Sequence, residues 1–321
     1  MSTTLTPPLS TIYEAQKLLS AYLQPTPLVP CTALARGDAQ LHLKLELQLP
    51  TASFKPRGAL YALATNLRRR SIEEVTASST GNHGAAVAFA AKTLGVRATI
   101  FLPANPNPVK HRRIADLGAQ IIEVGGQDLA AAFLEAREYS RRPGVYFLND
   151  ATDPDLPAGP ATIGLEILQQ LPLVAAIYVP MGDTALIRGL AAGVKQRNAR
   201  IQIIGVQAER APSYYLSWKE NRPMPTDTCD TIADGLATRT PEPDNVRAIR
   251  ELVDDVILVS EDEMLAAIGL LHQHAQVVAE PSGAATTAAF LKHPFPRGPV
   301  AALVTGGNIS DAIRLRAGLP A

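Results

Sequence analysis

A lysine in an unusual local setting is the first candidate for chemistry in this chain. Lys55 lies in the run TASFKPRGA (51–59), where hydroxyl and apolar side chains surround it and Pro56 follows directly. A lysine that is partly withdrawn from water has a lowered pKa, so its amine can act as a nucleophile or form a Schiff base. The run alone favours the plainer alternative, a solvated lysine at the start of a helix, because most lysines are surface charges.

A polar run, SSTGNHG (Ser78–Gly84), is the second candidate. Three adjacent hydroxyl residues, a glycine and the amide of Asn82 precede a predicted helix over Gly84–Leu94. Free backbone N–H groups at a helix start attract anions, and hydroxyl groups add further donors. One such residue is enough for an N-cap, so the length of the run favours a site for an amino-acid carboxylate.

A third candidate, MGDTALIRG (181–189), has the features of a phosphate-binding turn. Gly182 and Gly189 flank a turn between a predicted strand and a predicted helix, which suits phosphate. The GKS or GKT ending of a Walker loop is absent. Asp183 would repel a phosphate unless its carboxylate points away. A plain strand-to-helix connection therefore stays open as an alternative.

Two later runs, AEPSGAA (279–285) and TGGNIS (305–310), each place a polar side chain beside small residues. Glu280 either faces a site or is a solvated carboxylate. Thr305 follows a predicted strand, where its hydroxyl either binds a ring nitrogen or caps the turn. No HExxH or GxSxG motif occurs, so the sequence gives no support for a metal hydrolase or a serine hydrolase.

The elements that must position these residues alternate between short apolar runs and helical stretches, which predicts βαβ units and an α/β fold with parallel sheets. Ligands of such sheets bind at the carboxyl ends of the strands. The polar segment 221–245 reads as a long surface excursion. The predicted strands are Leu41–Glu46, Ala98–Pro103, Gln120–Gly125, Ala175–Pro180, Gln202–Gln207, Asp255–Ser260 and Val300–Thr305. The predicted helices include Asp128–Ser140, Thr162–Leu171, Ala185–Arg197 and Glu261–His274.

The composition excludes several classes of protein. Hydrophobic residues make up 46% and charged residues 19% of the chain, which supplies a core and argues against disorder. Basic and acidic residues balance at 30 each, so charge gives no argument for nucleic acid or an anionic membrane as partner. Apolar runs are too short to span a bilayer, no signal peptide is evident, and two distant cysteines favour reduced thiols. We expect a cytoplasmic protein with a small-molecule partner.

Taken in order, these runs resemble the fold-type II pyridoxal-phosphate enzymes, specifically the threonine/serine dehydratase and serine racemase family. The resemblance extends over nearly the whole chain and is carried by several motifs in family order. They are PTPL (25–28), Glu46 and Gln48, Ser53-Phe54-Lys55, Arg57-Gly58-Ala59, Gly-Asn-His-Gly (81–84), TIADGLA (231–237), AEPSGAA and TGGN. Because several motifs occur together in this order, the resemblance favours a catalytic Lys55 over a solvated one.

The resemblance implies a role for each matching position. Lys55 would carry pyridoxal 5'-phosphate covalently and then act as the base at the substrate Cα. Asn82 would bind the ring hydroxyl and Thr305 the ring nitrogen, with Phe54 and Glu280 lining the site. The substrate carboxylate would be held by Ser79, Thr80, Gly81, Asn82 and His83. The cofactor phosphate would be held by Gly182, Asp183, Thr184, Ala185 and Leu186.

The resemblance also implies an architecture and a reaction. The fold would be similar to the tryptophan synthase β chain, with a large cofactor domain (1–70 and 149–321). A small mobile domain (71–148) would close on the substrate carboxylate and exclude water. The reaction would convert threonine, serine or a relative such as an aryl serine or a hydroxyaspartate to a 2-oxo acid and ammonia. A homodimer is expected from the family.

Three alternatives stay open beside the ammonia-lyase. A racemase needs a second acid or base opposite Lys55, and Thr80 stands where racemases of this family have serine. A β-replacement enzyme tends to have Gly-Asn-Thr where this chain has Gly81-Asn82-His83. A binding protein that retains the cofactor without turnover is disfavoured because Lys55 is intact.

Departures from the family pattern bear on the substrate more than on the cofactor. Asp183, Thr184 and Ala185 replace glycines of the phosphate turn, and Leu148-Asn149-Asp150 replaces a His-Pro-Phe stretch. A neutral lining is expected from Ala52, Leu148 and Ala161, which argues against a second substrate carboxylate. Two of the acidic ligands of relatives that bind a divalent cation are missing, so no strong Mg²⁺ site is expected. The corresponding positions are Gln207, Ala211 and Ser213. No regulatory domain is expected after TGGN, and therefore no feedback control through one.

Overall fold

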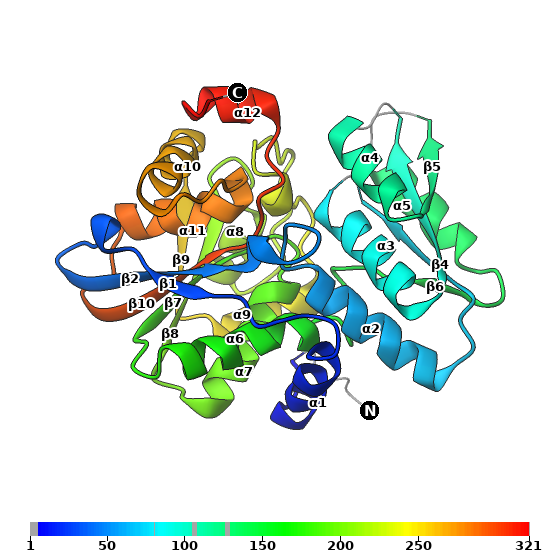
Figure 1. The fold of residues 1–321 in the computed structure, drawn as a ribbon, viewed down its shortest axis with the longest axis horizontal. Helices are drawn as coiled ribbons and strands as arrows, with labels where there is room; N and C mark the ends of the chain where they lie inside the picture. The colour runs from blue at the N-terminus through cyan, green and yellow to red at the C-terminus, as the bar shows by residue number, and fades with distance from the viewer. Residues whose placement is uncertain (1–5, 80, 105–107, 126–128, 321) are drawn as a thin grey trace.

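The larger of two sheets runs through the part of the molecule that contains both ends of the chain (Figure 1). The computed structural model describes residues 6–79, 81–104, 108–125 and 129–320. The sheet has the strand order β1-β2-β10-β7-β8-β9, and every neighbouring pair is parallel except β1 with β2. Its strands are β1 (Leu28–Pro30), β2 (Asp38–Leu45), β7 (Ala176–Pro180), β8 (Gln202–Ala208), β9 (Asp255–Val259) and β10 (Arg297–Val304).

Helices cover both faces of this sheet, which explains why its strands are almost continuously apolar. In β10, Val300, Ala302 and Val304 pack toward α10 and α11, whereas Ala301 and Leu303 pack toward α6, α7 and α9. The helices of this part are α1 (Leu9–Leu19), α6 (Ala158–Gln170), α7 (Ala185–Arg197), α8 (Ser213–Glu220), α9 (Pro243–Leu252), α10 (Glu261–Ala275), α11 (Pro281–Lys292) and α12 (Asp311–Arg316). Short 3-10 turns are η1 (Thr32–Leu34), η2 (Glu46–Gln48) and η3 (Asp234–Leu236).

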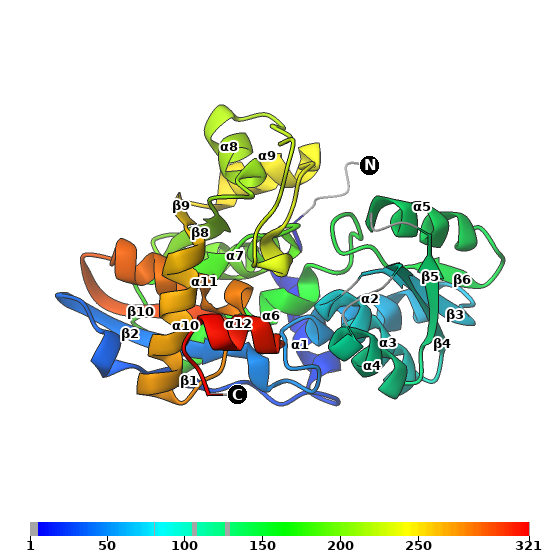
Figure 2. The same cartoon turned by 90° about the horizontal axis from the view of Figure 1, so that it is seen from above.

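The second sheet is built from one stretch of chain and is parallel throughout, in the order β5-β4-β3-β6. Helix α5 lies on one of its faces, and α3 and α4 lie on the other (Figure 2). Helix α2 packs against α3 of this part and against α6 of the larger part. The elements are α2 (Pro56–Arg69), β3 (Glu74–Ser78), α3 (Asn82–Leu94), β4 (Arg97–Pro103), α4 (Pro108–Asp116), β5 (Gln120–Val124), α5 (Leu129–Tyr139) and β6 (Val145–Phe147).

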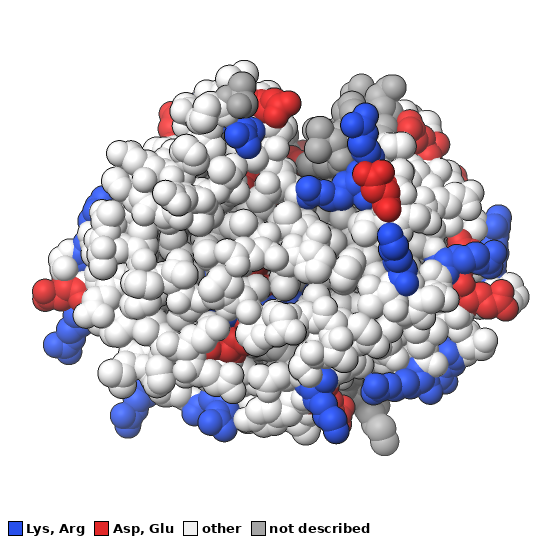
Figure 3. Space-filling model, in the orientation of Figure 1, with Lys and Arg blue, Asp and Glu red and all other residues white. Residues whose placement is uncertain are grey.

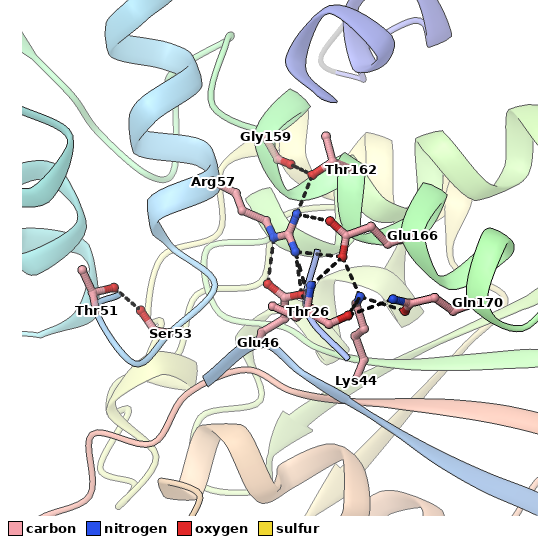
Figure 4. Close-up of polar contacts among 10 residues, drawn as sticks. All are labelled: Thr26, Lys44, Glu46, Thr51, Ser53, Arg57, Gly159, Thr162, Glu166 and Gln170. Atoms are coloured by element: carbon pink, nitrogen blue, oxygen red, sulfur yellow. Dashed lines mark hydrogen bonds and ion pairs between the residues drawn. The ribbon is translucent and has the colours of Figure 1, made fainter. Parts of the chain in front are cut away.

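A buried group of ions fixes the start of α2 against β2 and α6. The Arg57 guanidinium donates to Glu46 at 2.8 Å and to Glu166 at 2.6 Å, and Lys44 donates to Glu166 at 2.6 Å (Figure 4). Thr26 joins through its hydroxyl, which donates to Glu46 at 2.5 Å. The four charged residues, Lys44, Glu46, Arg57 and Glu166, form what we name the closed cluster. Its two cations and two anions balance, and the helix that follows Lys55 is thereby anchored.

The α/β prediction is confirmed, and all seven predicted strands are present to within a few residues. Three strands, β1, β3 and β6, were not predicted because each is short or, as in EVTAS, carries polar side chains. The buried Thr76 of β3 shows why: its hydroxyl donates to the carbonyl of Thr99 on β4 at 2.8 Å. No helix in the described ranges is long and apolar enough to cross a membrane. On the face drawn in Figure 3, basic and acidic side chains are scattered around a broad area that carries few charges.

Candidate functional site

A cavity of about 190 Å³ lies where the strands of both sheets end and the following helices begin. It is bounded by the ends of β3, β7 and β10 and by the first residues of α2, α3, α7 and α11, as expected for a ligand site in an α/β fold. Thr80 is outside the described residues. The other residues to which the resemblance gave a catalytic or binding role all line the cavity: Phe54, Lys55, Ser79, Gly81, Asn82, His83, Gly182, Asp183, Thr184, Ala185, Leu186, Glu280 and Thr305.

Lys55 is presented to the cavity by a turn that is tied to the end of β10. The Phe54 N–H donates to the Thr305 carbonyl at 3.0 Å, and Ala52 accepts from the Gly307 N–H at 2.9 Å. Ala52 has a φ of 51°, in the left-handed region that favours glycine. The last strand of the large sheet therefore fixes the backbone on both sides of Ser53, directly before the lysine.

The pKa of Lys55 differs from the expectation. Its Nζ lies 2.5 Å from Oδ2 of Asp150, and the two side chains are 23% and 22% exposed. Burial lowers the pKa of the lysine, but Asp150, Asp183 and Glu280 outweigh burial and raise it. The expected lowered pKa is therefore wrong for this arrangement, because a carboxylate that the sequence analysis did not place in the site is its direct partner.

Asp150 is the main residue that sequence reasoning missed. It follows β6, and its backbone is held from several sides: Asn149 accepts from the Ala151 N–H at 2.8 Å, and the Ala151 carbonyl accepts from Asn245 at 3.0 Å and from Arg188 at 3.2 Å. Burial would raise the pKa of the Asp150 carboxyl, but His83 and Lys55 hold it well below its usual range. The signal was present, because Asp150 belongs to the stretch that replaces the family's His-Pro-Phe.

His83 faces Asp150 rather than solvent. Its Nε2 donates to the Leu148 carbonyl at 2.9 Å, since a carbonyl only accepts, and its Nδ1 lies 3.9 Å from Asp150 Oδ2. Burial lowers the pKa of the imidazole, the Asp150 charge opposes this effect and the Lys55 charge adds to it, and the net shift is downward. His83 is therefore a neutral residue with its unprotonated nitrogen toward the carboxylate.

Asn82 is fixed by a chain of side-chain amides and a carboxylate. Its Nδ2 donates to Glu280 Oε1 at 2.6 Å, and its Oδ1 accepts from Asn308 Nδ2 at 2.5 Å. Asn308 also donates to the Thr51 carbonyl at 3.0 Å. A Cβ on Gly306 would lie 1.9 Å from Glu280 Oε1, so a larger residue there would displace this carboxylate from its place beside Asn82. Residues from the runs around positions 51, 82, 280 and 306 thus meet at one wall of the cavity.

The turn before α7 keeps its backbone close to a neighbouring loop. A Cβ on Gly182 would lie 2.1 Å from the Gly235 carbonyl oxygen, so the approach requires glycine. The Asp183 carboxylate accepts from the Thr238 hydroxyl at 3.3 Å, and burial together with the nearby Asp150 raises the pKa of Asp183 to about 6. Arg188, in the first turn of α7, donates to the Thr184 hydroxyl at 3.1 Å.

The lining differs from the neutral one that was expected. Leu148 and Ala161 are fully buried, and neither they nor Ala52 belong to the lining; Asp150 lies there instead. The segment 221–245 is likewise not only a surface excursion, because residues 234–238 of it line the cavity and Leu236 is buried. The TIADGLA run, noted above only as a family motif, was the available signal for this wall.

The cavity has the features that a pyridoxal phosphate requires. The Lys55 amine opens into it, and the first turn of α7 offers backbone N–H groups for a phosphate. The side chain of Asp183 is directed to Thr238, and Gly182 and Gly235 leave space where side chains would intrude. The buried Ser78 hydroxyl has no hydrogen-bond partner within the described residues. The residues present therefore fit this cofactor.

Comparison with known proteins agrees with this geometry. Residues 19–306 match the family described as "Pyridoxal-phosphate dependent enzyme". An L-threonine ammonia-lyase from Thermotoga maritima is 35% identical over 303 residues, which are 94% of this chain and 75% of that protein.

Two solved structures share the whole fold. Maize serine racemase has a TM-score of 0.90 at 27% identity, covering 98% of this chain and 97% of its own. The processed form of threonine deaminase isoform 2 from Solanum lycopersicum has a TM-score of 0.89 at 27% identity, covering 98% of this chain and 92% of its own. The chain therefore belongs to the pyridoxal-phosphate dependent enzymes, in the group of the threonine and serine dehydratases.

Proposed function

We propose that the protein is a dehydratase or ammonia-lyase that converts a β-hydroxy amino acid, such as threonine or serine, to a 2-oxo acid and ammonia. The observation that carries the proposal is Lys55, a lysine that opens into the cavity between the Asn82 wall and the turn before α7. Relatives named as threonine ammonia-lyase and threonine deaminase support the reaction class.

In this proposal Lys55 would hold the cofactor covalently through Nζ. Asn82 and Thr305 would hold its ring, and the Gly182–Leu186 turn would hold its phosphate. Arg188, behind this turn, offsets the charge of Asp183. When bound, pyridoxal phosphate takes up the electron pair that is released at the substrate Cα.

The proton steps fall to Lys55. Its amine removes the Cα proton as a general base, which requires the neutral form of the amine. Asp150, at 2.5 Å, stabilises the ammonium form and therefore opposes this step as long as no other cation is present. The partner of Asp150 during the reaction is thus the main question that the site raises.

We assign the substrate carboxylate to the start of α3. Ser79 and the backbone there line the cavity, and the Gly81 N–H lies 3.2 Å from the Ser79 hydroxyl oxygen. A carboxylate at this place gains hydrogen bonds and the favourable end of the helix dipole. Thr80, which we propose to contact the same group, would serve as the second acid or base if the enzyme also racemises its substrate.

We further propose that residues 71–148 close on the substrate as a small mobile domain. Their strands β3 to β6 form a sheet of their own, and the carboxylate-binding start of α3 belongs to this unit. We also propose a homodimer in the cytoplasm; its two cysteines, Cys31 and Cys229, are both unpaired, which suits a reducing compartment.

The test is release of 2-oxo acid and ammonia by the purified protein. With L-threonine, L-serine and larger β-hydroxy amino acids, the proposal expects the two products in equal amounts for at least one substrate. Chiral analysis of the remaining amino acid separates the second candidate, since racemisation without oxo acid would make the protein a racemase. That candidate is kept because maize serine racemase shares the fold over nearly the whole chain. Absence of both reactions would contradict the proposal.

A further inference from the structure

The cavity carries more negative than positive charge. Four carboxylates line it, those of Asp150, Asp183, Asp234 and Glu280. Within the described lining, Lys55 is the only lysine or arginine. A cofactor phosphate adds further negative charge. A site of this kind favours a cation, which a neutral side chain such as that of threonine does not supply.

Two of the four carboxylates have polar partners that do not depend on Lys55. Glu280 accepts from the Asn82 amide at 2.6 Å, and Asp183 accepts from the Thr238 hydroxyl at 3.3 Å. Asp150 differs, because the cation in direct contact with it is Lys55.

Lys55 is not available to Asp150 throughout the proposed reaction. The lysine must be neutral to accept the Cα proton, and a neutral amine no longer balances a carboxylate. His83 does not take its place in the structure, because its Nε2 donates to the Leu148 carbonyl and its Nδ1 lies 3.9 Å from Asp150, beyond hydrogen-bonding distance. The Asp150 side chain is only 22% exposed, and a carboxylate that lies largely out of water without a partner is unfavourable, so this position favours a further cation.

The carboxylate also does not turn away easily to find solvent. Ala151, the next residue, has its carbonyl bound by both Arg188 and Asn245, and Asn149 closes the turn on the other side. Arg188 and Asn245 come from α7 and α9 of the large part. Residues outside its own loop thus hold Asp150 in position, as expected for a side chain that recognises a ligand.

We propose that Asp150 is a specificity-determining residue that binds a cationic group on the substrate side chain. The amino acid processed here then carries an ammonium group beyond Cβ in addition to its β-hydroxyl. This inference rests on the proposed lyase function and names its substrate class. With such a substrate, the side-chain ammonium pairs with Asp150, and Lys55 is released to act as a neutral base.

Equilibrium binding to the holoenzyme tests this without turnover. 2,4-Diaminobutanoate and 2-aminopentanoate have the same shape, differ in one terminal ammonium against one methyl group, and lack a β-hydroxyl to eliminate. Titration calorimetry on the wild type is expected to give at least about 30-fold tighter binding of the diamino acid, the lower end for a buried charge pair. Equal affinities would overturn the inference without any mutation.

Two variants locate the effect. In Asp150→Asn the binding ratio is expected to fall to about threefold or less, because the amide carries no charge. Asp254→Asn is the matched control: Asp254 forms an ion pair of 2.6 Å with Lys195 and is outside the cavity lining, so the ratio is expected to stay as in the wild type. A preference that persists in Asp150→Asn would overturn the assignment.

Turnover then separates this inference from the proposed function. The 3-hydroxy forms of the same two amino acids are compared by kcat/KM for oxo-acid release, and the wild type is expected to prefer the cationic form. Oxo acid from both at equal kcat/KM leaves the lyase standing and overturns the role of Asp150. An equal loss on both substrates in Asp150→Asn, with the binding ratio unchanged, also overturns it, because Asp150 would then act in a proton transfer. Oxo acid from neither substrate, nor from threonine or serine, contradicts the proposed lyase itself, whatever the binding ratio.

Discussion

Two groups of charged residues meet at Pro56, one through Arg57, which follows it, and the other through Lys55, which precedes it. They differ in charge balance and in access to a ligand. The closed cluster has two cations and two anions, and its charged side chains are at most 8% exposed. Each of its carboxylates accepts from Arg57, and the guanidinium also donates to the hydroxyl of Thr162 at 3.0 Å. Such an arrangement has no vacant hydrogen-bonding position for a ligand, and its function is to hold elements together.

The second group, which we name the open cluster, consists of Lys55, His83, Asp150, Asp183 and Glu280. All five line the cavity, and its acids outnumber its single ammonium. Similar residue types therefore stabilise the fold where their charges balance and their hydrogen bonds are all satisfied. Where the charges do not balance, they form a site for a ligand. The difference lies in charge balance and access rather than in burial alone, because both groups lie largely out of water.

The largest effect is expected from removing the reactive amine of the open cluster. Lys55→Ala should lower oxo-acid release by about 10³-fold or more, since both the covalent anchor and the base are lost. Lys195→Ala, which breaks a lysine–aspartate pair far from the cavity, should retain activity. Undiminished turnover in Lys55→Ala would exclude this lysine from catalysis.

The closed cluster should respond in the opposite way, through stability. Arg57→Met leaves Glu46 and Glu166 buried without their main partner, and breaking a buried pair typically costs about 3–5 kcal/mol. Urea unfolding followed by circular dichroism measures the loss. A cost below about 1 kcal/mol would mean that the closed cluster does not hold α2 in place, and the comparison between the two groups would fail.

One acid of the open cluster, Asp183, should affect how the stability of the protein depends on pH. The pKa of Asp183 is raised to about 6 in the folded protein, against an ordinary value of 3.8. Between these values the folded state binds more protons than the unfolded state, so this residue lowers stability as pH rises from about 4 to 6. The free energy of unfolding of Asp183→Asn, relative to that of the wild type, should therefore rise by about 2 kcal/mol as the pH increases from about 4 to 6. A constant difference in unfolding free energy from about pH 4 to 7 would contradict the raised pKa.

An exposed ion pair should have the smallest effect on the free energy of unfolding. Arg141 and Glu138 pair at 2.9 Å at the end of α5, with side chains 74% and 64% exposed. Water screens such pairs, so Arg141→Ala should change the unfolding free energy by less than about 0.5 kcal/mol. A larger loss would show that exposure does not separate these classes of ion pair in this protein.

The sequence predicted the α/β class and most of the long elements because apolar periodicity is a local property. It did not predict β3, since the polar side chains of EVTAS are accommodated only when neighbouring strands supply partners, and it did not predict β6, since that strand has only three residues. The same limit applies to the closed cluster: nothing local in LHLKLE indicates that Lys44 meets a glutamate 122 positions away.

The residues that line the candidate site were predicted better than the contacts between them. Lys55, Asn82 and Thr305 were found because ordered motifs carried them. Asp150 was noted only as a departure, and its neighbour Leu148 was placed in the lining in its stead. A shift of two positions along an irregular loop changes which side chain faces a cavity, and hydrophobic pattern does not resolve such a shift.

The pairing of β10 with β2 has a consequence for how the enzyme is made. Val304 at the end of one strand is the register partner of Leu45 at the end of the other, and the turn that presents Lys55 is bonded to the residues that follow β10. During synthesis on the ribosome, β2 emerges long before its partner strand exists. The lysine turn therefore acquires its final backbone only when translation has passed Gly307, and shorter nascent chains lack the wall that the cofactor needs.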